Sequence, residues 1–107
     1  MAELPKPYRR FQEQFPEVYR AFEGLGETIA RVSCLDQKTR ELIRLGMAAA
    51  SRSESAVQSH THRALEAGAT PQEVEHAILL GITTLGFPTT MAALAWAREA
   101  IEDHFEK

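Results

Sequence analysis

The fold follows first from residues 64–74, which read ALEAGATPQEV. Gly68 is placed to end one helix in the left-handed conformation that glycine adopts without strain. Thr70, Pro71 and Glu73 are typical of the start of the next helix. They supply an N-cap hydroxyl, a proline at the first helical position and a glutamate spaced for a capping box. Because the connection is so short, we expect the two helices to form an αα-hairpin.

Helical periodicity extends from this hairpin towards both ends of the chain. The sequence predicts about six helices, comprising two N-terminal segments and then residues 36–51, 53–67, 70–85 and 89–105. Pro16 either begins the second helix or kinks a longer one. Neither an alternating strand pattern nor a hairpin turn signal occurs in the chain. We therefore expect an all-α bundle in a single domain, residues 1–107, with N-terminal helices in 1–32 and a core in 36–105.

Composition excludes several classes of protein. The chain has 107 residues with 44% hydrophobic and 25% charged residues, which is ordinary for a globular protein and unlike a disordered one. No apolar run approaches the ~20 residues of a membrane span, and the first ten residues lack the apolar core of a signal peptide. The single cysteine, Cys34, excludes an intrachain disulfide. We expect a reduced, cytoplasmic setting.

The charge and the apolar pattern bear on possible partners. The net charge of −3 and the pI of about 5.8 argue against nucleic acid or an anionic membrane as partner. Five aromatic residues recur at spacings of three and four, namely Tyr8, Phe11, Phe15, Tyr19 and Phe22. Such a stripe is typical of a core or a subunit contact. Leu79 and Leu80 add a second apolar face to their helix. We expect these faces to be covered in a homo-oligomer.

Two titratable residues stand out as candidates for chemistry. His60 lies on a face of small residues that leaves room beside the imidazole, formed by Ser53, Ala56, Val57, Ala64 and Ala67. It is either a satisfied core histidine or a catalytic group. Glu41 shares a helix face with Leu45. It either pairs on the surface with Lys38 or Arg44, or meets His60 in a proton-relay pair.

Metal chemistry is not indicated by the sequence. His60 and His62 are two residues apart and so lie on different sides of a helix. No Cys/His cluster has zinc spacing, and no glycine-rich phosphate loop is present. We therefore expect no metal and no cofactor.

Several segments together carry a family resemblance. They are residues 35–43 (LDQKTRELI), His60, residues 64–74, and the Gly86-Phe87-Pro88 break before an alanine-rich helix. In this order and spacing, from roughly Phe15 to Ile101, the chain resembles the carboxymuconolactone decarboxylase family, which includes the alkyl hydroperoxidase D proteins. The resemblance implies an all-α bundle of the hydroperoxidase-D type that assembles into trimers or hexamers.

The resemblance also implies roles for individual positions. The family's catalytic histidine and glutamate fall on His60 and Glu41, and its redox cysteines fall on Ser53 and Ala56. Both thiols are therefore missing, although a thiolate and a resolving thiol are what peroxide reduction requires. Cys34 is expected to be inert rather than a replacement nucleophile.

Three functions follow as hypotheses. The first is a His60/Glu41 pocket, bordered by Ser53, Ala56 and Val57, for a small hydrophobic or carboxylic molecule, with acid–base chemistry such as lactone decarboxylation. The nearest cations in sequence are Arg52 and Arg63, and neither is evidently placed to hold a substrate carboxylate. One alternative is alkyl hydroperoxidase activity, as in the cysteine-containing relatives. Another is a non-enzymatic oligomeric module that binds a small molecule.

Overall fold

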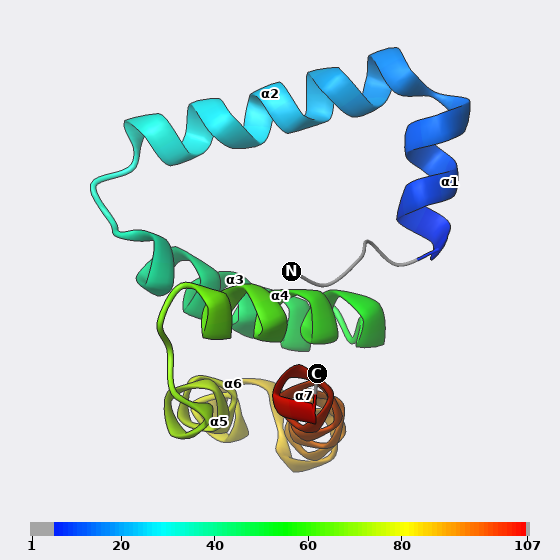
Figure 1. The fold of residues 1–107 in the computed structure, drawn as a ribbon. Coiled ribbons are helices and arrows are strands. Elements are labelled where there is room, and N and C mark those ends of the chain that lie inside the picture. Colours follow the sequence, from blue (N-terminus) through cyan, green and yellow to red (C-terminus); the bar gives the residue numbers. More distant parts are fainter. Residues whose placement is uncertain (1–5, 107) are drawn as a thin grey trace. The chain divides into compact units, whose positions relative to one another are not determined.

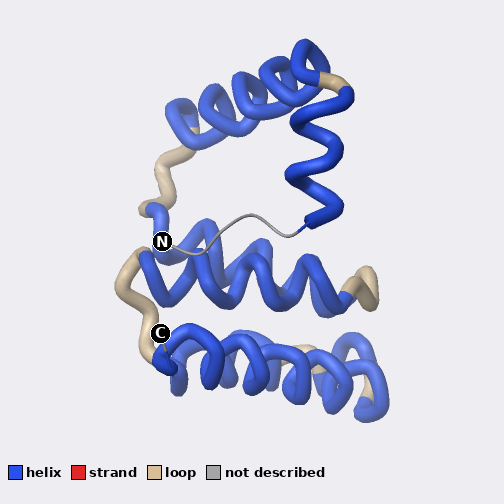
Figure 2. The backbone as a smooth tube through the Cα atoms, turned by 45° about the vertical axis from the view of Figure 1, so that its right-hand side comes forward, coloured by secondary structure: helices blue, strands red, loops and turns tan. Residues whose placement is uncertain are grey.

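The computed structural model describes residues 6–106, which form two compact units that meet in sequence between Cys34 and Leu35. The described residues form helices joined by short loops and contain no strand (Figure 2). The predicted all-α class is therefore confirmed. Residues 1–5, which belong to the ten residues considered above for a signal peptide, and Lys107 lie outside the described residues. None of the described helices is both long and apolar enough to cross a membrane.

The N-terminal unit consists of two helices, α1 (Lys6–Gln14) and α2 (Pro16–Val32). Pro16 is the first residue of α2, so it begins a new helix rather than kinking a long one. At the junction the ring of Phe11 lies 6.0 Å from that of Phe15 and 6.2 Å from that of Tyr19, edge-on in the second pair. No residue of either helix is buried. The aromatic stripe is thus not the core of this unit.

The second unit contains five helices (Figure 1). They are α3 (Gln37–Ala50), α4 (Glu54–Glu66), α5 (Pro71–Leu79), α6 (Ile82–Leu85) and α7 (Phe87–Glu106). In Figure 1, α3 and α4 lie side by side in one layer, while α5 and α7 are seen end-on in a second layer that packs against the first. The core between these layers mixes branched side chains with alanines, and its fully buried members include Leu45, Val57, Ala64, Val74, Ile78, Ala93 and Ala97. Small residues allow the helices to approach closely.

The predicted hairpin caps are present. The Thr70 hydroxyl accepts a hydrogen bond from the backbone amide of Glu73 at 3.0 Å, and the Glu73 carboxylate accepts one from the amide of Thr70 at 2.9 Å. This reciprocal pair is the capping box expected at the start of α5. Gly68 has φ +102°, as expected where a helix ends in the left-handed region. Asp36 caps α3 by accepting from the amide of Thr39 at 2.8 Å.

The predicted helix over residues 70–85 is wrong in one respect, because it is split into α5 and α6 at Gly81. A Cβ atom at Gly81 would lie 3.0 Å from the Leu85 side chain and 3.1 Å from both the Ile78 carbonyl and the Thr90 hydroxyl. The turn between α5 and α6 is therefore tightly packed around Gly81, and α7 contributes to that packing. The described residues consequently form seven helices rather than about six.

Two stretches of apolar surface are uncovered within the single chain. Leu79 and Leu80 are both exposed, Leu80 by 77%, so their coverage in a homo-oligomer stays a prediction. In the second half of α3, Leu45, Ala48 and Ala49 are buried, while Met47 is 64% exposed. Both stretches lie on the same unit.

Candidate functional site

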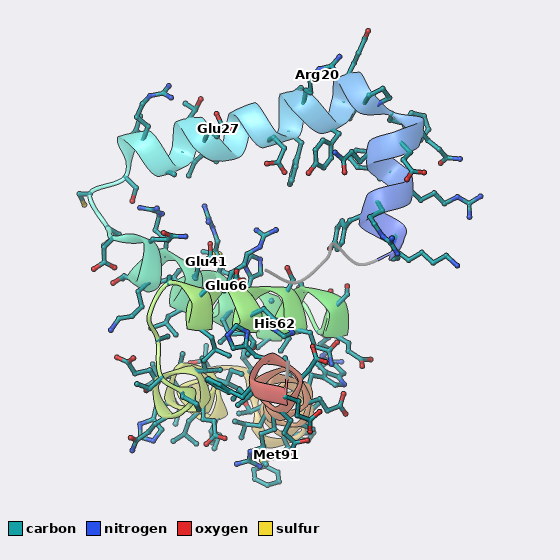
Figure 3. The ribbon with its side chains drawn as sticks, viewed as in Figure 1. Arg20, Glu27, Glu41, His62, Glu66 and Met91 are labelled. Atoms are coloured by element: carbon teal, nitrogen blue, oxygen red, sulfur yellow. The ribbon has the colours of Figure 1, made fainter. Side chains whose placement is uncertain are left out.

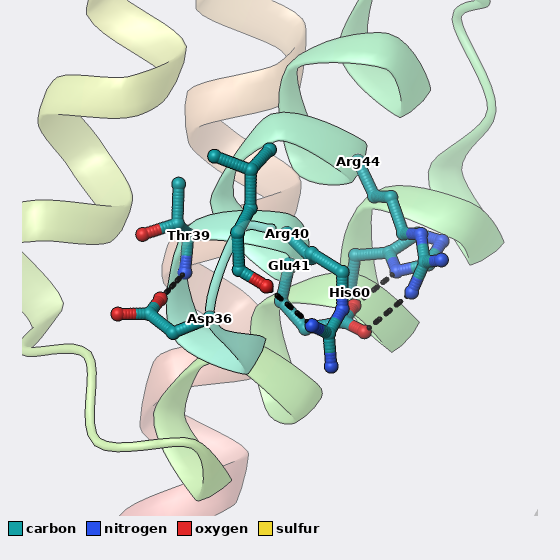
Figure 4. A network of polar contacts seen from close by, with 7 residues as sticks. Asp36, Thr39, Arg40, Glu41, Arg44 and His60 are labelled. Carbon is teal, nitrogen blue, oxygen red and sulfur yellow. Dashed lines mark hydrogen bonds and ion pairs between the residues drawn. The ribbon is translucent and has the colours of Figure 1, made fainter. Parts of the chain in front are cut away.

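The α3–α4 pair positions the candidate site. Glu41 lies one turn before Leu45 on the buried face of α3, and His60 lies one turn before Ala64 on α4. Because these two faces pack together, Glu41 Oε1 and His60 Nδ1 are only 2.8 Å apart (Figure 4). The expected contact between the two side chains is confirmed. Their chemical role stays a prediction.

A third residue, Arg44, completes the arrangement. Its guanidinium donates to Glu41 Oε2 at 3.0 Å, so each oxygen of the carboxylate has its own partner (Figure 4). Pairing with Arg44 and contact with His60 were treated as alternatives in sequence, whereas the structure has both. Lys38, the other cation considered for Glu41, instead lies 3.1 Å from Glu73.

Burial differs among Glu41, His60 and Arg44, which we call the trio. The Glu41 side chain is 7% exposed, that of His60 is 22% exposed and that of Arg44 is 32% exposed. The carboxylate is thus enclosed, whereas parts of the imidazole and of the guanidinium reach solvent. The trio presents two nitrogen-bearing groups outward over a buried negative charge.

The electrostatics keep Glu41 ionised. Burial raises the pKa of Glu41, but hydrogen bonds and charge from His60 and Arg44 outweigh it, and the pKa lies below its ordinary value. An ionised carboxylate only accepts hydrogen bonds, so the hydrogen between the two side chains is on His60 Nδ1. In the neutral imidazole the lone pair is then on Nε2, which is the arrangement of a general base.

The predicted binding residues fall in different environments. The Ser53 hydroxyl accepts from the amide of Ala56 at 3.2 Å and so serves as the N-cap of α4. Ala56 is partly buried one turn before His60, and Val57 is fully buried in the core. Ala56 therefore shares the helix face of His60, whereas Val57 belongs to the core. The thiol of Cys34 is exposed.

His62 is largely enclosed. Its side chain is 19% exposed, its Nδ1 lies 3.2 Å from Nδ1 of His104, and its Nε2 lies 3.4 Å from the Asp103 carboxylate (His62 is labelled in Figure 3). α4 thus carries two histidines on different faces, one facing α3 and one facing α7. Among residues 6–106, no group of three or more His, Cys, Asp or Glu side chains is arranged to hold a metal ion.

Two shallow hollows lie away from Glu41 and His60. One is lined by Arg52, Trp96 and the first turns of α7, and the other lies between α3 and the α5–α6 segment. Neither is lined by a residue of the trio. The opening of the trio to solvent is therefore through the exposed parts of His60 and Arg44.

Taken together, these observations define an all-α helical protein in which a buried carboxylate contacts a histidine from the neighbouring helix. Residues 16–99 match the profile of the carboxymuconolactone decarboxylase family, and the chain belongs to this family. The family indicated by the sequence resemblance is thereby confirmed.

Two individual proteins are similar to large parts of this chain. An uncharacterised protein of Haemophilus influenzae is 36% identical over 61 residues, which is 57% of this chain and 54% of that protein. The chain thus spans about half the length of that relative. An uncharacterised protein of Methanocaldococcus jannaschii is 29% identical over 84 residues, covering 78% of this chain and 81% of that protein.

Solved structures show the same fold. A carboxymuconolactone decarboxylase family protein from Legionella pneumophila superposes with a TM-score of 0.79 at 28% identity, covering 92% of this chain and 87% of that one. A candidate carboxymuconolactone decarboxylase from Burkholderia xenovorans gives a TM-score of 0.74 at 26% identity, covering 94% and 81%.

Proposed function

We propose that this protein binds a small hydrophobic or carboxylic molecule beside His60 and Glu41 and carries out acid–base chemistry on it, such as lactone decarboxylation. The observation that carries the proposal is the 2.8 Å contact between Glu41 and His60, with Arg44 on the second carboxylate oxygen. This arrangement orients the imidazole and leaves its Nε2 as the group that meets the substrate.

Each residue of the trio has a part in the proposed reaction. When a lactone acid loses CO₂, the electrons of the broken carbon–carbon bond remain on the ring and spread towards its carbonyl. Protonated His60 delivers a proton to the carbon, and the anionic Glu41 stabilises the imidazolium before that transfer. A proton from solvent then restores His60.

Arg44 supplies the cation that was not evident in the sequence. Its guanidinium has five N–H donors, of which one is bound to Glu41, and the side chain is partly exposed. Planar, bidentate pairing with a carboxylate suits this group. Arg44 is therefore our candidate for holding the substrate carboxylate, in place of Arg52 or Arg63.

A panel of unsaturated lactone acids tests the proposal, with CO₂ release measured for the wild type and for His60→Ala. We expect turnover that is lost in His60→Ala, at least 100-fold, while the circular dichroism of the variant is unchanged. His76→Ala is the matched control, because His76 is exposed on α5. Saturable binding with no turnover of any compound would instead support the non-enzymatic binding module.

We further propose a homo-oligomer, a trimer or a hexamer, located in the cytoplasm and acting without a metal or cofactor. The support for assembly is the amount of exposed apolar surface, which includes Phe22, Val32, Leu80 and Phe87. Sedimentation at micromolar concentration tests it, and a stable monomer would contradict it.

A further inference from the structure

One face of α2 carries a regular apolar seam. Its members follow one another at spacings of four, three, four and three residues, as in a heptad repeat, and we call them the α2 seam: Val18, Phe22, Leu25, Ile29 and Val32. Their exposed fractions lie between 45% and 76%. A 3.5-residue apolar period is the pattern by which a helix packs along another helix.

The charges of α2 lie on the other side of the helix. They are Glu17, Arg20, Glu23, Glu27 and Arg31, of which Arg20 and Glu27 are labelled in Figure 3. The positions that border the seam are occupied by Tyr19, Ala21, Gly26 and Thr28. A two-stranded coiled coil would carry charges at these bordering positions. A broad uncharged stripe suits a surface formed by two helices.

The second unit has such a surface. The hollow of about 350 Å³ between α3 and α5–α6, which we call the α3–α5 groove, is lined without any charged residue. Its small lining residues are Gly46, Ala49, Ala50, Ala77 and Gly81, and its larger ones include Ile43, Met47 and Leu80. Large side chains on a helix fit between two helices whose facing residues are small.

We propose that the α2 seam of one copy of this chain docks in the α3–α5 groove of a second copy. Each chain has one seam and one groove, both are uncharged, and both are exposed within the single chain. No other partner is needed to cover both faces. Since every chain gives one helix and receives one, such contacts can close into a ring, as in the proposed trimer or hexamer.

The size of the contact, if the whole seam is covered, lies near the lower limit for a specific interface. α2 has 17 residues and is about 25 Å long. Burying five seam side chains at roughly 100 Å² each, with an equal area of groove, removes about 1,000 Å² from water per docked helix. Each chain takes part in two such contacts. The inference is independent of the acid–base chemistry at His60, because neither face contains a residue of that trio.

Substitutions on the helix test one side of the contact. Leu25→Arg places a charge in the seam, and Gly24→Arg places the same charge next to it but away from the seam, where a Cβ atom meets nothing. Light scattering on the full chain should give an oligomer for the wild type and Gly24→Arg, and a monomer of unchanged helicity for Leu25→Arg. A monomeric wild type, or equal masses for the two variants, would overturn the proposal.

Substitutions in the groove test the other side. A Cβ atom at Gly46 meets nothing within 4 Å in the chain, so a larger side chain there occupies the groove without a clash. Gly46→Phe should lose the oligomer without a fall in melting temperature relative to monomeric Leu25→Arg, whereas Gly46→Ala should keep it. An oligomer that persists in Gly46→Phe would exclude the groove as the docking site.

Cross-linking identifies the occupant. Two chains with Cys34→Ser are co-expressed with different tags, one carrying Leu25→Cys and the other Met47→Cys, and treated with a short bismaleimide. We expect a cross-link that joins the two tags. Cross-linking of the Leu25→Cys chain to itself would show α2 pairing with α2 instead. A third protein carries both Leu25→Cys and Met47→Cys in one chain, and a cross-link within that chain would show docking within the monomer. Either result would overturn the proposal.

Discussion

A carboxylate with two different partners is the decisive feature at the scale of single residues. In sequence, Glu41 and Arg44 are three apart on one helix, which is a spacing typical of a surface ion pair. His60 is on another helix, so its contact with Glu41 depended on how α3 and α4 pack. Periodicity predicted that His60 faces inward and left Glu41 either on the surface or beside His60, and the resemblance to the family favoured a meeting of the two. It did not predict that each carboxylate oxygen is bound to a separate residue.

The lowered pKa of Glu41 predicts how stability changes with pH. Because the pKa is lower in the folded chain than in the unfolded one, where Glu titrates near ~4.3, ionised Glu41 stabilises the fold at neutral pH. This stabilisation is lost as the pH falls through the folded-state pKa. Glu41→Gln should therefore lower the free energy of unfolding by about 1–3 kcal/mol at pH 7.

The same difference should shrink at pH 3, because this pH lies below the ~4.3 at which the carboxyl group of the unfolded chain takes up a proton. Urea unfolding of both proteins at the two pH values measures it. Glu66→Gln is the matched control, since Glu66 is exposed on α4, and it should change stability little at either pH. A constant deficit for Glu41→Gln at both pH values would argue that the carboxylate acts only through its shape.

At the scale of helices, the features predicted from neighbouring residues were correct. The feature that involves a contact with a distant helix was not predicted. The caps Asp36, Thr70 and Gly68 depend on residues within a few positions of each other, and the structure has them as predicted. The split between α5 and α6 lies at Gly81, which Thr90 of α7 approaches from 9 residues further along the chain. An apolar period of three and four continues through Gly81, so the pattern alone predicts one helix there.

The packing around Gly81 predicts opposite effects for two glycine substitutions. Gly81→Ala introduces a Cβ atom 3.0–3.1 Å from three neighbours, one of them a backbone carbonyl, and should destabilise the fold by about 1–3 kcal/mol. Gly26→Ala meets nothing within 4 Å inside α2 and should not destabilise, with up to ~1 kcal/mol gained from helix propensity. Thermal unfolding of the two variants compares them. Equal melting temperatures would show that the α5–α6 turn relaxes.

At the scale of the whole molecule, the resemblance to the family predicts the absence of one activity. It implies that Ser53, whose hydroxyl caps α4, and Ala56 stand where the cysteine-containing relatives carry their redox thiols. We expect no reduction of organic hydroperoxides with dithiol donors, measured as peroxide consumption by the full chain. Turnover that disappears in Cys34→Ser would instead assign a nucleophilic role to the exposed thiol.

The apolar faces of the two units predict how the assembly responds to solution conditions. An interface formed by the α2 seam and the α3–α5 groove contains no charged residue, so screening by salt removes nothing from it. The driving force is burial of apolar surface, which weakens on cooling. Sedimentation of the wild type should therefore give the same or tighter association in 1 M than in 0.1 M sodium chloride, and weaker association at 4 °C than at 25 °C.

Dissociation at high salt would mean that ion pairs hold the copies together. The charged face of α2, with Arg20 and Glu27, would then be the contact surface instead of the seam.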